Sequence, residues 1–531
     1  MHSTYKTAHF RYLCASILCA GTLACFPASA STDVSSFGAT GNGSTDDTNA
    51  IQTAINSVAP GTILTFGGPN QVFLISSRLV LRPNMIYQGQ GTVRMSASAP
   101  PHTAIAMLTY NNSNNTTIRG ITFDANGVGG GLQIAVNGAG AIPADSVVLD
   151  HLIFRNTTSA PQGAWDGAVY DSVGLTNSQI TNNQVMNCAI GMYLTDPNAV
   201  TISNNLFQDV HIGDAIQIVF SPAPFTYGQA ISITQNTGQH LGRMGIEVWP
   251  SGGDTAQSSQ VQGIVVSGNT FTAWDTGYNT DTFGISMMAG QQNSIVGNKL
   301  VGPTTGFGIE MGAPGTTVSQ NSITGFSTGI VLHDSSNSTV TGNFLTNQNY
   351  DGVEFSNAWG NRTNVVVQGN SIVNAQTFGI YMNTSSWGGT NITGNFIART
   401  GGLFAGDSSQ TFFGIATTPP VAPVSVTGNS IVQDSTNAPA QFSFVGIQLN
   451  GGSGANASST YLNNNVMSQL QLTQSVGIVG NSPGSMDGAV IQGNSFTGLY
   501  AASGGAASSG AVSSGNLIYN CTMVGPIVLA P

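Results

Sequence analysis

Short apolar stretches alternate with polar turns along most of this chain, and one four-residue frame recurs through its middle. The frame is Gly, then Ile or Val, then a variable residue, then an apolar residue. A variable position between apolar neighbours is typical of the outward position of a short strand. The frames occupy residues 245–248, 284–287, 308–311, 329–332, 352–355, 379–382 and 446–449.

Asparagine-containing turns alternate with these frames from about residue 150 to residue 516. They recur every 22 to 36 residues, and an alternating strand lies on each side of them. The pattern predicts three short strands per repeat, with Asn and Gly adopting left-handed backbone at the corners. Equivalent asparagines would then stack into amide ladders. We therefore expect an all-β fold, a parallel β-helix solenoid whose coils stack in register. The turns lie at 204–205, 235–236, 268–269, 297–298, 320–321, 342–343, 369–370, 394–395, 428–429, 464–465 and 493–494.

The N-terminal segments differ from the repeats. Residues 1–30 have a basic start, an apolar run too short to span a bilayer, and a small-x-small ending at Ala28 and Ala30, which predicts a secretory signal peptide. Residues 46–56 carry Ile51 and Ile55 on one helical face, and we expect this helix to cap the open end of the solenoid. The predicted organisation is a signal peptide (1–30), an N-terminal cap (31–60), the β-helix (61–520) and a C-terminal end (521–531).

Charge is scarce and acidic in this chain. Charged residues make up 6% of the sequence and the net charge is −11. Nucleic acid binding requires a basic surface, so this composition argues against it. No segment after residue 30 reads as transmembrane.

The predicted mature chain opens with a motif that comprises Asp33-Val34, Phe37-Gly38-Ala39, Gly41-Asn42-Gly43, Thr45-Asp46-Asp47-Thr48, Ala50-Ile51-Gln52 and Ala54-Ile55. This opening resembles that of the pectate-lyase-like (pectin-lyase-fold) superfamily, and the repeats resemble those of its sugar-binding and sugar-hydrolysing members. The resemblance implies a right-handed parallel β-helix that acts on or binds polysaccharide. The catalytic motifs of polygalacturonases, pectate lyases and mannuronan epimerases are absent, so no catalytic residue can be carried over.

All three glutamates of the chain, Glu247, Glu310 and Glu354, occupy the variable slot of a frame. Adjacent coils lie about 4.8 Å apart, which predicts roughly 9 to 10 Å between successive glutamate backbones. That spacing suits the carboxyl pair of an inverting glycosidase better than that of a retaining one. The alternative is a solvated face that happens to use Glu.

Other residues join this stripe as candidates. Asp214 precedes Glu247 by one coil, and we expect it to occupy the slot that Gly holds elsewhere and to raise the pKa of Glu247. His333 and Asp334 form the only His-Asp pair, with a plain solvent-facing corner as the alternative. Trp249 is either a sugar platform or a wedge under the loop that follows it. The remaining candidate substrate ligands are Tyr381, Asn383, Arg243 and Gln217.

We expect a secreted or periplasmic glycoside hydrolase that binds a polysaccharide or oligosaccharide, with no cofactor and no metal. In this hypothesis Glu310, the middle carboxylate, is the general acid, because both neighbours oppose its ionisation, and Glu247 or Glu354 is the base. One alternative is a lyase or C5-epimerase acting on uronates, which needs a cation such as Arg243. The other is a non-catalytic carbohydrate-binding or surface solenoid.

Overall fold

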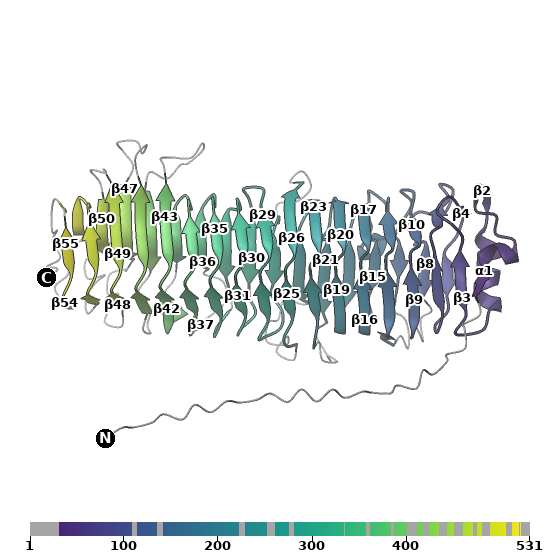
Figure 1. Cartoon of the computed structure of the whole chain (residues 1–531), viewed down its shortest axis with the longest axis horizontal. Coiled ribbons are helices and arrows are strands. Elements are labelled where there is room, and N and C mark those ends of the chain that lie inside the picture. The colour runs from purple at the N-terminus through teal and green to yellow at the C-terminus, as the bar shows by residue number, and fades with distance from the viewer. Residues whose placement is uncertain are drawn as a thin grey trace, which may run out of the picture.

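The chain folds into one long rod of stacked coils, and the one α-helix among the described residues lies at the N-terminal end of the rod (Figure 1). The computed structural model describes residues 31–521 apart from a set of internal gaps. The predicted signal peptide lies outside the described residues. The gaps are 109–113, 135–141, 222–228, 252–260, 276–280, 334, 357–361, 384–386, 401–410, 418–423, 435–442, 451–459, 471–474, 481–488, 506–511 and 520.

Three long parallel sheets run the length of the rod, and each coil contributes one strand to each sheet. Sheet A runs from β1 (Ser31–Asp33) to β54 (Val512–Ser514), and sheet B runs from β2 (Asn42–Asp46) to β55 (Leu517–Tyr519). The predicted right-handed parallel β-helix is confirmed. Sheet C, which carries the recurring frames, consists of β5 (Leu79–Leu81), β8 (Ala106–Leu108), β11 (Leu132–Gln133), β15 (Val169–Asp171), β18 (Met192–Thr195), β21 (Ile216–Phe220), β24 (Ile246–Pro250), β27 (Ile285–Met287), β30 (Phe307–Met311), β33 (Thr328–Leu332), β36 (Asp351–Phe355), β40 (Phe378–Met382), β44 (Thr411–Thr417), β47 (Ser443–Leu449), β50 (Ser475–Gly480) and β53 (Ala501–Gly505).

The N-terminal helix α1 (Thr48–Ser57) covers the end of the solenoid. It begins two residues later than predicted, because Asp46 lies in β2 and its Oδ1 accepts from the Thr48 amide at 3.0 Å. Its buried face includes Ile51 and Ile55, which join the core of the coils. Residues 31–60 do more than cap the rod, since β1 and β2 within them already pair with the second coil of sheets A and B.

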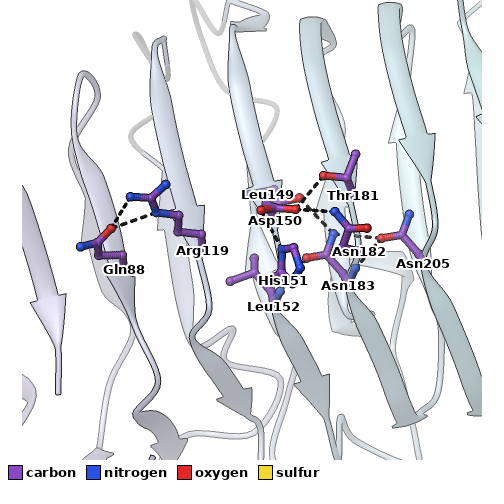
Figure 2. A network of polar contacts seen from close by, with 10 residues as sticks. All are labelled: Gln88, Arg119, Leu149, Asp150, His151, Leu152, Thr181, Asn182, Asn183 and Asn205. Carbon is purple, nitrogen blue, oxygen red and sulfur yellow. Dashed lines mark hydrogen bonds and ion pairs between the residues drawn. The ribbon is translucent and has the colours of Figure 1, made fainter. Parts of the chain in front are cut away.

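A ladder of buried asparagines runs along the corner between sheets A and B, as the turn pattern predicts. Each ladder side chain donates from Nδ2 to Oδ1 of the equivalent asparagine one coil on, at 2.9 to 3.1 Å, and to a backbone carbonyl of the preceding coil. Figure 2 shows its start, where Asn183 donates to Leu149 O and to Asn205 while its Oδ1 accepts from the Leu152 amide. The members are Asn183, Asn205, Asn236, Asn269, Asn298, Asn321, Asn343, Asn370, Asn395, Asn429, Asn465, Asn494 and Asn516.

The glycine of each frame is required by close packing between coils. A Cβ at Gly308 would lie 2.6 Å from the carbonyl oxygen of Gly329 and 2.3 Å from the Ile323 side chain. The same near contact with the next coil's glycine carbonyl recurs at Gly284 and Gly352. The backbone of sheet C therefore stays in tight register, which fixes the stacking of the variable slots.

The interior between the sheets is filled by one continuous core of Ile, Val, Leu, Phe and Met side chains. Among the described residues, no helix is both long and apolar enough to cross a bilayer.

Candidate functional site

The variable slots of the frames form one column along the outward surface of sheet C, which we call the outer column. Strand register pairs Glu247 with Ser286, Ser286 with Glu310, Glu310 with Val331 and Val331 with Glu354. The predicted alignment of the three glutamates is thereby confirmed. From Gln217 onward the run is Gln217, Glu247, Ser286, Glu310, Val331, Glu354, Tyr381, Ala416, Gln448, Val479 and Gly504. Before Gln217 the same register continues back through Tyr193, Tyr170, Gln133, Met107 and Val80.

A second column, three residues earlier in each strand, runs beside the outer column, and we call it the edge column. Its members were not predicted as site residues, apart from Asp214. It consists of Asp214, Met244, Phe283, Phe307, Thr328, Asp351, Phe378, Phe413, Val445 and Val476.

Arg243 holds two carboxylates together at the N-terminal end of these columns. Its Nη1 lies 2.7 Å from Asp214 Oδ2, and its Nη2 lies 2.9 Å from Glu247 Oε1. The side chains of Asp214 and Glu247 are 1% and 5% exposed. Gln217 adds a hydrogen bond from Nε2 to Glu247. Buried charges at this density are tolerated because they are paired and hydrogen-bonded.

This cluster corrects two expectations. Register places Ala215 opposite Gly245, so Asp214 does not fill the glycine slot; it lies beside Met244, whose amide donates to it at 3.0 Å. The raised pKa belongs to Asp214 itself: burial, and then the charge of Glu247, raise the pKa of Asp214 to about 8. Glu247 is also buried rather than open to solvent.

Glu310 lies in a different environment at the middle of the outer column. Its Oε2 accepts from Ser286 Oγ at 2.6 Å, and its Oε1 lies 3.0 Å from His333 Nε2. The side chains of Glu310 and His333 are 14% and 13% exposed, so both reach the surface. The predicted environment of Glu310 contained only repulsion from the neighbouring glutamates. The structure adds two polar partners that hold the Glu310 carboxylate in place.

Glu354 and Asp351 form the next acidic group, two coils beyond Glu310. Burial raises the pKa of Glu354, while His333 and the amide of Asn383, 3.2 Å from Oε1, partly oppose that rise. Asp351 is fully buried at the base of the same strand. Neither of its carboxylate oxygens meets a hydrogen-bond partner in the part of the chain that the structure describes. The nearby Phe378 amide donates to Tyr350 O at 3.4 Å, and its proximity to Asp351 slightly favours the ionised carboxylate. Burial and the charge of Glu354 raise the pKa of Asp351 well above its usual value.

An aromatic platform adjoins these acids on the C-terminal side. Phe378 stacks on Tyr381 with ring centroids 4.2 Å apart and on Phe413 at 4.9 Å, and Tyr350 packs edge-on against Phe378. Tyr350 is 46% exposed. Aromatic faces beside carboxylates and an amide can hold the apolar face of a sugar ring while its hydroxyls form hydrogen bonds.

The other predicted candidates lie apart or outside this group. Trp249 is half-buried on β24, two residues beyond Glu247. Asp334 lies outside the described residues. The missed residues Asp351, Phe378 and Phe413 share the position three before each variable slot, directly before the glycine of each frame. Extending the alignment of the frames by one residue toward the N-terminus would have revealed them.

Residues 227–400 match a protein family described as periplasmic copper-binding protein (NosD). This match covers less than half of the chain. The described residues contain no group of three or more His, Cys, Asp or Glu side chains placed to hold a metal ion, so we find no donor set for copper in this part of the molecule.

Solved structures with similar coils include enzymes and an adhesin, all at low identity. The catalytic unit of an α-1,3-glucanase from Streptomyces thermodiastaticus is 14% identical, covering 85% of this chain and 70% of that one, with a TM-score of 0.46. An alginate lyase is 12% identical over 69% and 85%, with a TM-score of 0.47. A surface adhesin of Streptococcus pneumoniae is 13% identical over 79% and 99%, with a TM-score of 0.42. No curated protein sequence matches the chain. The fold of the chain, a right-handed parallel β-helix, follows from its own three parallel sheets.

Proposed function

We propose that this protein is an exported glycoside hydrolase that cleaves a polysaccharide on the outward surface of sheet C, between Glu310 and Glu354. The observation that carries the proposal is the difference between these two carboxylates. Burial raises the pKa of Glu354, which keeps it protonated closer to neutral pH, as a general acid requires. Ser286 and His333 hold Glu310 as an oriented acceptor.

The separation of the pair favours inversion. Glu310 and Glu354 lie two strands apart, roughly 9 to 10 Å at the backbone. An inverting enzyme holds its carboxyls about 6.5 to 9.5 Å apart, which leaves room for a water molecule. We assign Glu354 as the acid that protonates the leaving oxygen and Glu310 as the base that activates this water. The assignment replaces Glu310 as acid, because the burial that raises a pKa lies at Glu354.

Lyase or epimerase chemistry has weaker support. That chemistry needs a cation free to neutralise the carboxylate of a uronate. Arg243, the cation predicted for this role, already contacts both Asp214 and Glu247. Desolvation lowers the pKa of Arg243, but the charges of these two carboxylates raise it by more, so the pKa is raised overall. Its charge is therefore balanced within the protein.

The decisive experiment measures reducing-end release from a panel of polysaccharides by wild type, Glu310→Gln and Glu354→Gln. Each substitution keeps the side-chain shape and removes the ionisable group, so we expect turnover to fall at least a hundredfold, the usual scale for a lost acid–base group. Asp209→Asn in β20 (Leu206–Val210) of sheet B is the matched control, since it removes a carboxylate from another face. Full activity in both Gln variants would contradict the assignment, and no release of reducing ends by wild type from any polysaccharide would favour the binding solenoid. Ultraviolet absorbance from unsaturated uronates would instead indicate a lyase.

A further inference from the structure

From Glu247 toward the C-terminus, the outward surface of sheet C changes from acidic to aromatic to aliphatic. Beyond Glu354 the outer column continues through Tyr381 to Ala416, and the edge column continues from Phe413 to smaller aliphatic residues. Because side chains shrink on successive strands while the backbone spacing stays constant, a hollow opens behind the last large ring.

This hollow has a volume of about 470 Å³. Val445, Val476 and Val479 form its floor in neighbouring strands, and register places Val445 beside Val476. Phe413 and Tyr500 stand at its two ends. Both floor valines of β50 are half-exposed, so apolar surface faces outward here. None of the lining residues carries a formal charge.

The hollow continues directly from the aromatic platform. Phe413 belongs to both, since it stacks on Phe378 on one side and lines the hollow on the other. Val476 in β50 is four strands from Glu354 in β36, roughly 19 Å along the rod. A polysaccharide lying over the carboxylates and the platform would therefore extend over the hollow.

We propose that the hollow binds the methyl group of a substituted neutral sugar unit, either an acetyl ester or a 6-deoxy sugar. The inference rests on the proposed function and names the substrate class more closely. An ordinary hexose would press hydroxyl groups against valines without hydrogen bonds, which costs free energy. A methyl group gains by removing apolar surface from water. The lining residues that the structure describes are uncharged and so favour a neutral sugar over a uronate, and Gln448 supplies an amide for a neighbouring hydroxyl.

Saturation-transfer NMR on the full chain tests this proposal with three probes: methyl glucoside, its 6-O-acetyl ester and its 6-deoxy counterpart. We expect at least one methyl-bearing probe to bind at least fourfold tighter than methyl glucoside, with the strongest transfer at the methyl protons. The factor corresponds to burial of one methyl-sized group. The probe that binds identifies the source of the methyl group. Equal binding of all three would overturn the proposal.

Val476→Thr and Val479→Thr locate the binding, because threonine keeps the shape of valine and adds a hydroxyl. We expect each to lower the affinity for the methyl-bearing probe about fourfold. Val366→Thr, at a half-exposed valine in β38 (Val366–Gln368) of sheet A, is the matched control and should bind as wild type. Unchanged affinity in both test variants would overturn the proposal. The proposal would also be overturned if wild type dimerised and these variants did not, because the hollow would then bind a second copy of the chain. We expect Glu354→Gln to bind the methyl-bearing probe as wild type does, whatever its hydrolytic activity. Probe binding in this variant therefore tests the hollow independently of the proposed hydrolysis.

Discussion

Single buried carboxyls give this molecule an unusual dependence of stability on pH. Asp171 is fully buried on β15, and burial raises its pKa to about 7. In the unfolded chain the same group ionises near its ordinary value of about 3.9. Between these two values the folded state keeps a proton that the unfolded state releases. The free energy of unfolding therefore falls as pH rises through this window.

Asp171→Asn should remove this contribution. The amide keeps an oxygen that can accept from the Gly174 amide, which now donates to the carboxylate at 3.2 Å, and it does not ionise. Between pH 4 and pH 7 we expect the free energy of unfolding to fall less in the variant than in wild type. The two decreases should differ by up to a few kcal/mol. Denaturant unfolding at both pH values measures the difference. Identical slopes for the two proteins would contradict the expected pKa of Asp171.

Arg243 is predicted to matter to folding more than to chemistry. Arg243→Met should leave Asp214 and Glu247 buried without their shared cation, and breaking a buried pair of this kind typically costs about 3 to 5 kcal/mol. Because the two acids then take up protons more readily, the loss should be largest above neutral pH and smaller in acid. Thermal melts at pH 5 and pH 8 measure both effects. The exposed Arg119, which donates only to Gln88 (Figure 2), provides Arg119→Met as a control. Equal melting temperatures for Arg243→Met and wild type at pH 8 would rule out this role.

Among secondary-structure elements, the asparagine ladder is the contact that most clearly joins one coil to the next through side chains. Asn343 lies in its middle, where it accepts from Asn321 and donates to Asn370. Asn343→Ala should remove the acceptor of the Asn321 backbone and side-chain amides and the donor to Val318 O, while Asn370 Oδ1 still accepts from the backbone amide of residue 343. At about 1 to 3 kcal/mol for each unsatisfied group, we expect a loss of about 2 to 5 kcal/mol.

Urea unfolding of Asn343→Ala measures this loss. Asn391→Ala is the matched control, since Asn391 is exposed on β42 (Thr390–Thr393), and its effect should stay within about 0.5 kcal/mol. A ladder variant as stable as the control variant would show that the amide contacts contribute nothing net.

The sequence predicted elements better than it predicted the site. Strand spacing and Asn turns indicated the coils, because each coil repeats the same local rules and a shift of one residue would expose the core. The outer column followed from the same register. Asp351 and Phe378 were missed because each lies immediately before a frame glycine, outside the four-residue frame. The partners of Glu310 and Arg243 were missed because they come from other coils, and sequence spacing does not reveal which side chains bend toward one another.

For the whole molecule, the predicted export signal makes a direct prediction. β1 begins at Ser31 and pairs with β3 (Ile63–Phe66), so the first coil can form without residues 1–30. We expect material recovered from outside the cytoplasm of the native host to start at Ser31 or close to it. N-terminal sequencing checks this, and a mature protein that starts at Met1 would contradict it.

The asparagine ladder also has a mechanical consequence. Within the ladder, a side-chain amide such as that of Asn236 donates hydrogen bonds to the coil before it and to the coil after it, so one side chain joins three successive coils. A force that pulls the two ends of the rod apart would act on these hydrogen bonds in series. The coils would then detach one at a time from a tip, and each detachment would release the 22 to 36 residues between successive turns. A rod pulled at both tips would therefore lengthen in discrete steps, one for each coil, before the whole chain unfolds.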